Sequence, residues 1–276
     1  MKTEVYEPQK YVKMGIRVWP FMFRELWEAR ELVWRLFMRS FSARYRLSLL
    51  GYVWVLITPA VAIGTFLFLK KAGVVAIGPT AAPYVVFAFA GLCVYQLFSS
   101  GVVAGCTDLT EAGDMVARVS FPREVLVVAA VGGAVFEFLV KAVFLLIVCA
   151  VTGFMPAAGA VLSLVAVIPV VFLVLGCAFF LSLANAVIRD VAQIAALGLT
   201  FLMFLTPVLY PVPRAGLVLF HLNPLTALVD GPRDLFIYGS LRDPQGFVLS
   251  AVFSIWVFFV GWRIFHLVET KIPERL

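Results

Sequence analysis

Two ionisable residues lie inside a long apolar run of the sequence. Glu137 and Lys141 are four residues apart between Val125 and Val151, so on a helix their side chains share one face and could form an ion pair. Charges are costly within a membrane and normally face a bundle interior or a water-filled path. The spacing supports two interpretations, a site in a translocation path or a mutually neutralised pair that fixes packing. The second is the simpler one.

The sequence lacks the usual motifs of enzymatic and metal chemistry. It contains no G-x-x-x-x-G-K-[ST] phosphate-binding loop, no G-x-S-x-G motif and no H-E-x-x-H motif. Its two histidines, His221 and His266, are predicted to lie on opposite sides of a membrane. Its four cysteines are dispersed within or beside apolar runs, where we interpret them as core residues. We therefore expect no catalytic residues, cofactor site, metal site or ATPase activity in this chain.

The composition indicates a membrane protein. Of the 276 residues, 63% are apolar and 14% are charged, and the mean hydropathy is +1.02. Soluble domains are typically about 45–50% apolar and about 25% charged. The apolar residues fall in runs of roughly 20, enough for a helix to cross about 30 Å of hydrocarbon. We predict an all-α membrane protein with six transmembrane helices at 47–69, 83–104, 125–151, 161–187, 191–209 and 247–268.

The basic residues indicate how these helices are oriented. Sixteen of the 22 Lys and Arg residues fall on the side of the two termini, five fall on the opposite side, and Lys141 lies within a span. Segments rich in Lys and Arg stay in the cytoplasm. We therefore predict a multi-pass protein of the bacterial inner membrane with both termini cytoplasmic. The predicted regions are a cytoplasmic segment at 1–46, a transmembrane domain at 47–268 and a cytoplasmic tail at 269–276.

The segment before the first span has the pattern of an amphipathic helix. Its polar residues, among them Arg35 and Arg39, recur every three or four positions, and so do its apolar residues, among them Trp27, Trp34 and Tyr45. We expect this helix to lie at the cytoplasmic interface, with its basic groups near the anionic headgroups of membrane lipids. Two roles stay open, a membrane-surface anchor and a docking or gating element. The net charge of +6 is explained by such positions, so we do not expect nucleic acid as a partner.

The connection between the second and third spans contains a further short helix. Asp108, followed three residues later by Glu111, resembles a helix N-cap with its partner carboxylate. A helix from about Leu109 to Arg118, carrying Asp114, would follow. A short charged helix on the cytoplasmic side suits contact with a soluble partner, and a solvated linker helix is the alternative.

The connection at 210–246 is too apolar for an ordinary external loop. Its apolar segments are too short to span and are interrupted by proline and glycine. Non-helical backbone at membrane depth is tolerated only where protein or water covers it, so we predict two short re-entrant helices on the external side, with interfacial helices as the alternative. The residues that mark this region are Pro207, Tyr210, Pro211, Asn223, Pro224, Arg233 and Asp234.

Aromatic residues make up 14% of the sequence. A path lined by aromatic side chains would suit sugar rings, whose apolar C–H faces can slide along them without tight hydrogen bonding. The residues selected for such a path are Trp34, Tyr45, Tyr84, Phe87 and Tyr95. Contact with lipid or with the core is the alternative for each of them.

Taken in order, these elements resemble the permease subunits of type-2 ABC exporters, in the branch that exports O-antigen, capsule or teichoic-acid polymers. The resemblance extends over about residues 22–268. After the basic amphipathic segment, it rests on RYRLSLLGYVWVLITPA (44–60), VSFPREVL (119–126), RDVAQ (189–193), TPVLYP (206–211) and NPLTALVDGPRDLFIYG (223–239). These elements point to the superfamily more strongly than to a particular substrate.

The resemblance implies a homodimer of six-span subunits, paired with two copies of a separate ATP-binding subunit that would hold ATP and Mg²⁺. Residues 108–118 would form the coupling helix against that ATPase, the amphipathic helix would help form the cytoplasmic entrance, and the re-entrant helices would close the external mouth. The substrate would be a polysaccharide on an undecaprenyl-linked lipid. The alternatives are a small-molecule or lipid exporter of the same superfamily and, from another class, a secondary transporter or channel. Scarce ionisable residues in the spans argue against a proton-coupled pump.

Overall fold

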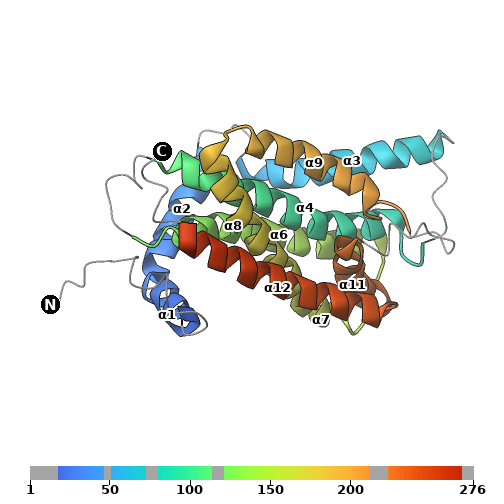
Figure 1. Ribbon diagram of the computed structural model, residues 1–276. Coiled ribbons are helices and arrows are strands. Elements are labelled where there is room, and N and C mark those ends of the chain that lie inside the picture. Colours follow the sequence, from blue (N-terminus) through green and yellow to red (C-terminus); the bar gives the residue numbers. More distant parts are fainter. Residues whose placement is uncertain (1–17, 47–50, 73–79, 114–120, 212–222, 269–276) are drawn as a thin grey trace.

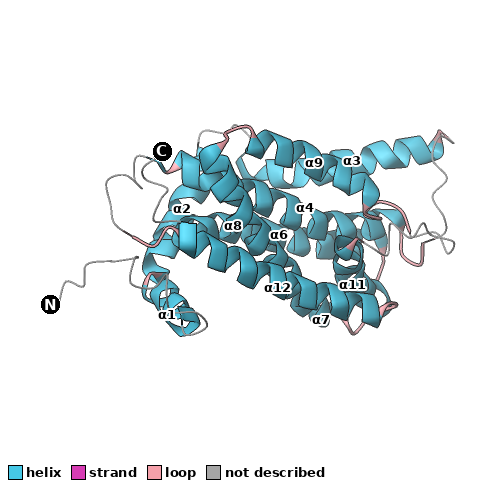
Figure 2. Cartoon of the chain, viewed as in Figure 1, coloured by secondary structure: helices cyan, strands magenta, loops and turns pink. Residues whose placement is uncertain are grey.

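The structure is a computed structural model that describes residues 18–46, 51–72, 80–113, 121–211 and 223–268. Within these ranges it is helical, without strands (Figure 2). The helices are α1 (Trp19–Glu28), α2 (Arg30–Arg46), α3 (Trp54–Lys71), α4 (Tyr84–Glu111), α6 (Glu124–Thr152), α7 (Ala160–Ala166), α8 (Ile168–Val187), α9 (Val191–Leu205), α11 (Pro224–Tyr238) and α12 (Pro244–Val268), with a 3₁₀ turn, η3 (Gly51–Val53), before α3.

Four helical segments of the described chain are long and apolar enough to cross a membrane. They are α4, α6, the continuous segment Ala160–Val187 made by α7 and α8, and α12. Each coincides with a predicted span. The first and fifth predicted spans correspond to shorter apolar helices, Trp54–Leu69 within α3 and Val191–Leu205 as α9. The chain is therefore an all-α, multi-pass membrane protein.

The bundle is built around α4, which packs against α6 and α8, while α8 also packs against α12 (Figure 1). In the most apolar 18-residue window of α4, 78% of the residues are buried, against 28% in α6 and in α12. Glycines allow the closest crossing. A Cβ on Gly261 of α12 would lie 2.6 Å from the backbone oxygen of Gly176 on α8, so neither position has room for a side chain.

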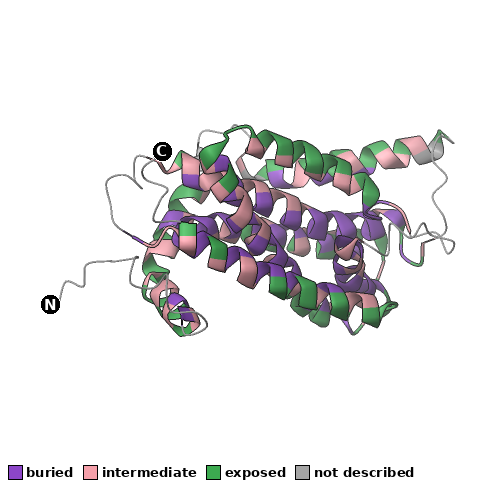
Figure 3. Cartoon of the chain, viewed as in Figure 1, coloured by how far each residue is buried: buried purple, intermediate pink, exposed green. Residues whose placement is uncertain are grey.

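Helices α3 and α9 are attached to the outside of this bundle through α4. No residue of α9 is buried, and its large apolar side chains, including Ile194, Leu197 and Phe201, are exposed. α3 is a mixture of exposed and intermediate positions with a few buried ones, among them Val55 and Ile63 (Figure 3). One flank of the bundle therefore presents uncovered apolar side chains.

Two helices replace the single amphipathic helix that was predicted before the first span, and they meet at Ala29. α1 packs on α12, where Trp19 and Phe23 contact Phe259 and Trp262 with ring centres 5.0 and 4.7 Å apart. α2 packs on α6. Their two prominent tryptophans point away from the bundle, Trp27 being 71% and Trp34 62% exposed.

The prediction that a separate helix begins at about Leu109 was wrong. α4 continues through Glu111, so Asp108 lies in its last turns, where its carbonyl accepts a hydrogen bond from Ala112, and is not an N-cap. The physical reason is packing, because Cys106 and Leu109 are both fully buried and continue the core-facing stripe of α4. Residues 114–120, which include Asp114 and Arg118, lie outside the described part of the chain.

Proline sets two further boundaries that differ from the predicted ones. The fourth span is divided into α7 and α8 at Val167, and Pro169 occupies the first turn of α8, where its missing N–H has no cost. α9 ends at Leu205 rather than Leu209 because Thr206, which precedes Pro207, adopts an extended conformation.

Candidate functional site

Two cavities lie one after the other along α4 and α6. The first, of about 500 Å³, lies between α2, the end of α4 and the first half of α6, and we call it the α2 cavity. The second, of about 680 Å³, lies among α3, α4, α6 and α9, and we call it the middle cavity. Glu137 lines both cavities. The two cavities therefore extend from one end of the bundle toward its centre.

The α2 cavity brings together polar residues that the sequence placed in separate elements. Arg39 of α2 lines it with Asp108 and Glu111 from the end of α4, and Glu137 of α6 forms its deeper wall. Of the other residues selected on the amphipathic segment, Trp27, Trp34 and Arg35 do not line it. The side chain of Tyr45 lies outside the described residues.

Three of the hydroxyl groups that line the middle cavity already donate their protons within their own helices. Thr58, Ser100 and Thr200 each donate a hydrogen bond to the carbonyl four residues earlier on their own helix. Their oxygens therefore face the cavity mainly as acceptors. The Tyr95 hydroxyl donates to the carbonyl of Leu199, which joins α4 to α9 across this cavity.

Glu137 and Lys141 both line the middle cavity, but they do not form the expected direct ion pair. Among the described residues, no carboxylate lies within 4.0 Å of the Lys141 ammonium group, although Glu137 acts on it electrostatically. Lys141 is only 4% exposed. A buried cation at this depth is thus left without a direct partner inside the described subunit.

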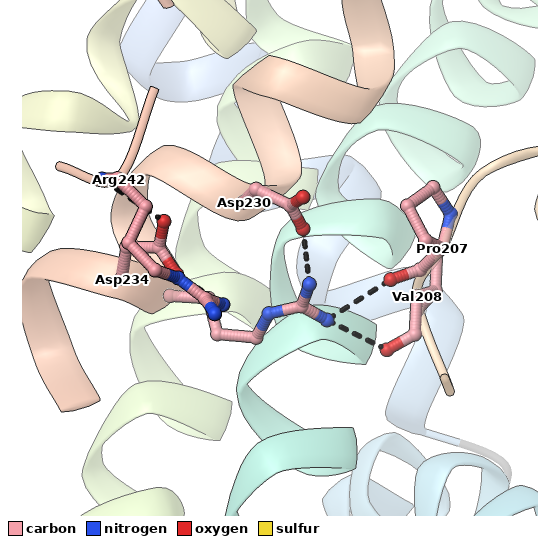
Figure 4. Close-up of polar contacts among 6 residues, drawn as sticks. Pro207, Val208, Asp230, Asp234 and Arg242 are labelled. Atoms are coloured by element: carbon pink, nitrogen blue, oxygen red, sulfur yellow. Dashed lines mark hydrogen bonds and ion pairs between the residues drawn. The ribbon is translucent and has the colours of Figure 1, made fainter. Parts of the chain in front are cut away.

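At the opposite end of the bundle, a buried arginine organises the chain around α11 (Figure 4). Arg233 is 1% exposed and donates hydrogen bonds to the carbonyls of Pro207 and Val208, at 3.0 and 3.1 Å. Its guanidinium also pairs with Asp230 and lies 4.0 Å from the centre of the Phe87 ring. We call Arg233, these partners and the neighbours described next the α11 hub.

Further hydrogen bonds hold the non-helical segment after α9 in the α11 hub. Asn223 caps α11 by accepting a hydrogen bond from the N–H of Leu225 at 3.0 Å, and its amide donates to the Thr206 hydroxyl at 3.1 Å. The Tyr84 hydroxyl donates to the carbonyl of Leu209 at 3.0 Å. The backbone after α9 is therefore bound to both α11 and α4, which is the protein cover that the sequence required.

The hub contains a second charged pair and a perturbed carboxyl group. Asp234 accepts hydrogen bonds from the side chain of Arg242 at 3.0 Å and from its N–H at 3.3 Å. Burial raises the pKa of Asp230 to about 6, although Arg233 opposes that rise. The Tyr210 hydroxyl donates to the carbonyl of Phe204 at 2.6 Å, so it ties the segment to the end of α9.

Residues from distant parts of the chain meet again at the α2 end of the bundle. Glu124, at the start of α6, is fully buried, and its Oε1 lies 2.9 Å from Nδ1 of His266 at the end of α12. Asn185, at the end of α8, donates to the carbonyl of Cys106 at 3.2 Å and accepts from the N–H of Ala192 at 3.2 Å. The first contact joins α6 to α12, and the other two join α8 to α4 and to α9.

The structure separates the residues selected as path aromatics. Tyr95 lines the middle cavity, whereas Tyr84 and Phe87 are buried in the α11 hub and line neither the α2 cavity nor the middle cavity. Sequence reasoning missed Trp54 and Thr200, which complete the middle cavity. The sequence signal for these two residues was a hydroxyl or an indole in an otherwise apolar run. The sequence contained no signal for the contact between Glu124 of α6 and His266 of α12.

The chain is similar over most of its length to curated bacterial proteins. It is 27% identical over 260 residues to the O-antigen export system permease protein RfbA of Myxococcus xanthus, covering 92% of this chain and 99% of that protein. It is 26% identical over 243 residues to the protein of the same name from Klebsiella pneumoniae, covering 86% and 92%. The family model for the ABC-2 type transporter matches residues 31–237, from α2 through α11. The chain therefore belongs to the ABC-2 type transporter family.

Proposed function

We propose that this chain is the transmembrane permease subunit of an ATP-driven exporter that moves a lipid-linked, O-antigen-like polysaccharide across the bacterial inner membrane. Membership of the ABC-2 type transporter family supports the exporter, and the names of the similar proteins from Myxococcus and Klebsiella support the substrate class.

The observation that carries the proposal is the arrangement of the two cavities. They follow one another from the α2 end toward the middle of the bundle, and Glu137 belongs to both. The middle cavity presents hydroxyl acceptors together with Trp54 and Tyr95. Sugars carry many hydroxyl donors and apolar ring faces, so this lining matches a glycan better than a purely apolar cargo.

A homodimer of six-span subunits is the arrangement that we propose. Lipid covers exposed apolar side chains in a bilayer, but the middle cavity between α3 and α9 also holds Glu137, Lys141 and hydroxyl groups, which a second copy of the chain would shield from lipid. Such a dimer would bring two middle cavities to a shared interface. In a bilayer, α3 and α9 would then complete the set of six spans, with the regions at 1–46, 47–268 and 269–276 as predicted.

The α2 end is the cytoplasmic end in this proposal, because the segments rich in Lys and Arg adjoin it. Residues 108–118 would contact two copies of an ATP-binding subunit that holds ATP and Mg²⁺. α1 and α2 would line the entrance, with Trp27 and Trp34 facing membrane lipids. The α11 hub, within the region at 210–246, would close the external mouth.

Deletion of the gene in its host, with complementation, tests the proposal. Surface glycan and glycan retained in spheroplasts are compared in the deletion strain, the complemented strain and a strain whose ATPase partner is inactive. We expect loss from the surface and accumulation inside both mutants. An unchanged surface without an internal pool would refute glycan export and favour a small-molecule exporter. Export that persists without the ATPase would favour a secondary transporter or channel.

A further inference from the structure

We propose that Lys141 forms an anion-binding subsite in the middle cavity, which holds an acidic group of the transported molecule as it passes. The chemical class is a phosphate or carboxylate, carried either by the lipid part or by the sugars of the substrate. This inference rests on the proposed function and assigns to one residue a role within it.

The position of Lys141 is unusual for a cation. It lies 17 residues after Glu124, which corresponds to about 25 Å along α6, near the middle of a helix that crosses the membrane. Lys141 is only 4% exposed. A charged group at such a depth is costly unless it is paired or faces a water-filled cavity, and intramembrane charges of this kind mark substrate paths.

The surroundings of Lys141 supply solvent access but no direct counter-charge. The side chain lines the middle cavity, and no carboxylate of the described residues lies within 4.0 Å of its ammonium group. Glu137 is one turn away and acts on it electrostatically without contact.

Among the described residues that line the middle cavity, Lys141 is the only charged hydrogen-bond donor, and the Gln96 amide and the Ser99 hydroxyl are neutral donors beside it. The hydroxyls of Thr58, Ser100 and Thr200 already donate to their own helices, so they offer oxygens to a ligand. A ligand with hydroxyl donors and one acidic group would satisfy both features, with the acidic group at the ammonium.

The test uses the permease–ATPase complex in lipid nanodiscs, with Lys141→Met, which keeps the length of the side chain, and Lys141→Arg, which keeps its charge. Arg189→Gln is the matched control, because it removes one positive charge at an exposed position outside both cavities. The probes are farnesyl diphosphate against farnesol, and an oligogalacturonate against a malto-oligosaccharide of equal length. Binding affinity is measured for each probe, and the apparent melting temperature is measured for each variant.

We expect Lys141→Met to weaken the binding of at least one acidic probe by about tenfold or more, equivalent to about 1.4 kcal/mol. Lys141→Arg and Arg189→Gln should stay close to the wild type, and the neutral probes should bind all variants alike. A selective effect on the diphosphate would assign the subsite to the lipid part, and a selective effect on the oligogalacturonate would assign it to acidic sugars. The melting temperature of Lys141→Met without ligand should not fall, because a buried charge has been removed.

Unchanged affinity of Lys141→Met for both acidic probes would overturn the inference. So would a lower melting temperature of that variant without a binding defect, since it would show a structural partner for the ammonium, from Glu137 or a second subunit. In either case glycan export by the wild type would stand. Failure of the wild-type complex to export glycan would instead refute the proposed function.

Discussion

Arg233 is the most sensitive point of the α11 hub, and its replacement by methionine should destabilise the protein strongly. Methionine can keep the contact with Phe87, but two backbone carbonyls and Asp230 lose their donor. Removing one partner of a buried ion pair costs about 3–5 kcal/mol, and Asp230, whose side chain is 22% exposed, keeps part of its hydration and so contributes at the lower end of that range. We expect a loss of about 3–5 kcal/mol of unfolding free energy at pH 8 for Arg233→Met.

The loss should depend on pH in a defined direction. The pKa of Asp230 in the folded protein is about 6, above its ordinary value of 3.8, so the folded state binds more protons between these values. Stability from this group is therefore greatest at low pH and declines as the pH rises to about 6. Without Arg233 the pKa of Asp230 should rise further, so the decline should continue above pH 6. At pH 5.5 only the carbonyl hydrogen bonds are lost, which costs about 2 kcal/mol.

The measurement is unfolding in SDS titrations and by tryptophan fluorescence at pH 5.5 and pH 8. When Arg233→Met is combined with Asp230→Asn, the loss of unfolding free energy should no longer grow between pH 5.5 and pH 8, because the unpaired carboxyl group is gone. Arg35→Met is the control, since both partners of its pair with Glu31 are exposed, 79% and 77%, and such a pair should contribute about 1 kcal/mol or less. A loss for Arg233→Met that is as small as the control, or equal at both pH values, would refute this account of the hub.

The other predictions concern the α2 end and the helix crossings. Glu124→Ala should cost about 2–3 kcal/mol in the same unfolding assay, because it removes the buried hydrogen bond at Nδ1 of His266. Gly261→Ala should cost about 1–3 kcal/mol, since its methyl group would meet α8 at 2.6 Å. Asn185→Leu should lower transport more than ATP hydrolysis, because it breaks links among α4, α8 and α9. Charge reversal at Glu111 and Asp114 together should lower transport and uncouple it from hydrolysis.

Controls distinguish these effects from general damage. Gly64→Ala should be neutral or slightly stabilising, because no neighbouring atom lies within 4 Å of the added methyl group. Glu124→Gln keeps a group that can either donate to or accept from Nδ1 of His266, so it should lose less than Glu124→Ala. Full export with coupled hydrolysis in the Glu111 and Asp114 double variant would contradict a coupling role for that segment, and equal loss of both activities in Asn185→Leu would indicate simple instability.

The sequence predicts the long helices well because their signal is local. The third span was predicted at 125–151, and α6 runs from Glu124 to Thr152. Its start follows Pro122, and its end is set by Gly153, which has a positive φ of 69° and closes the helix in the left-handed region. An apolar run between two such residues contains all the information that its boundaries require.

Features that depend on packing between distant segments could not be predicted in this way. The continuation of α4 past Asp108 follows from the burial of Leu109, which local charge and capping patterns do not reveal. The contact between Glu124 and His266 joins residues 142 positions apart. Phe87 was selected for a substrate path because it is aromatic, but its ring packs against the guanidinium of Arg233. No sequence pattern connects these two residues.

The attachment of α9 connects the middle cavity with both ends of the bundle. α9 has no fully buried residue, and beside the apolar contacts of Leu199, Leu202 and Met203 several hydrogen bonds fix its position. They lie at its start, through Asn185, at its middle, through Tyr95, and just after its end, through the α11 hub. The same helix walls the middle cavity beside Lys141. A displacement of the end of α4 would thus reach the cavity through a few directional contacts, each of which a single substitution can remove.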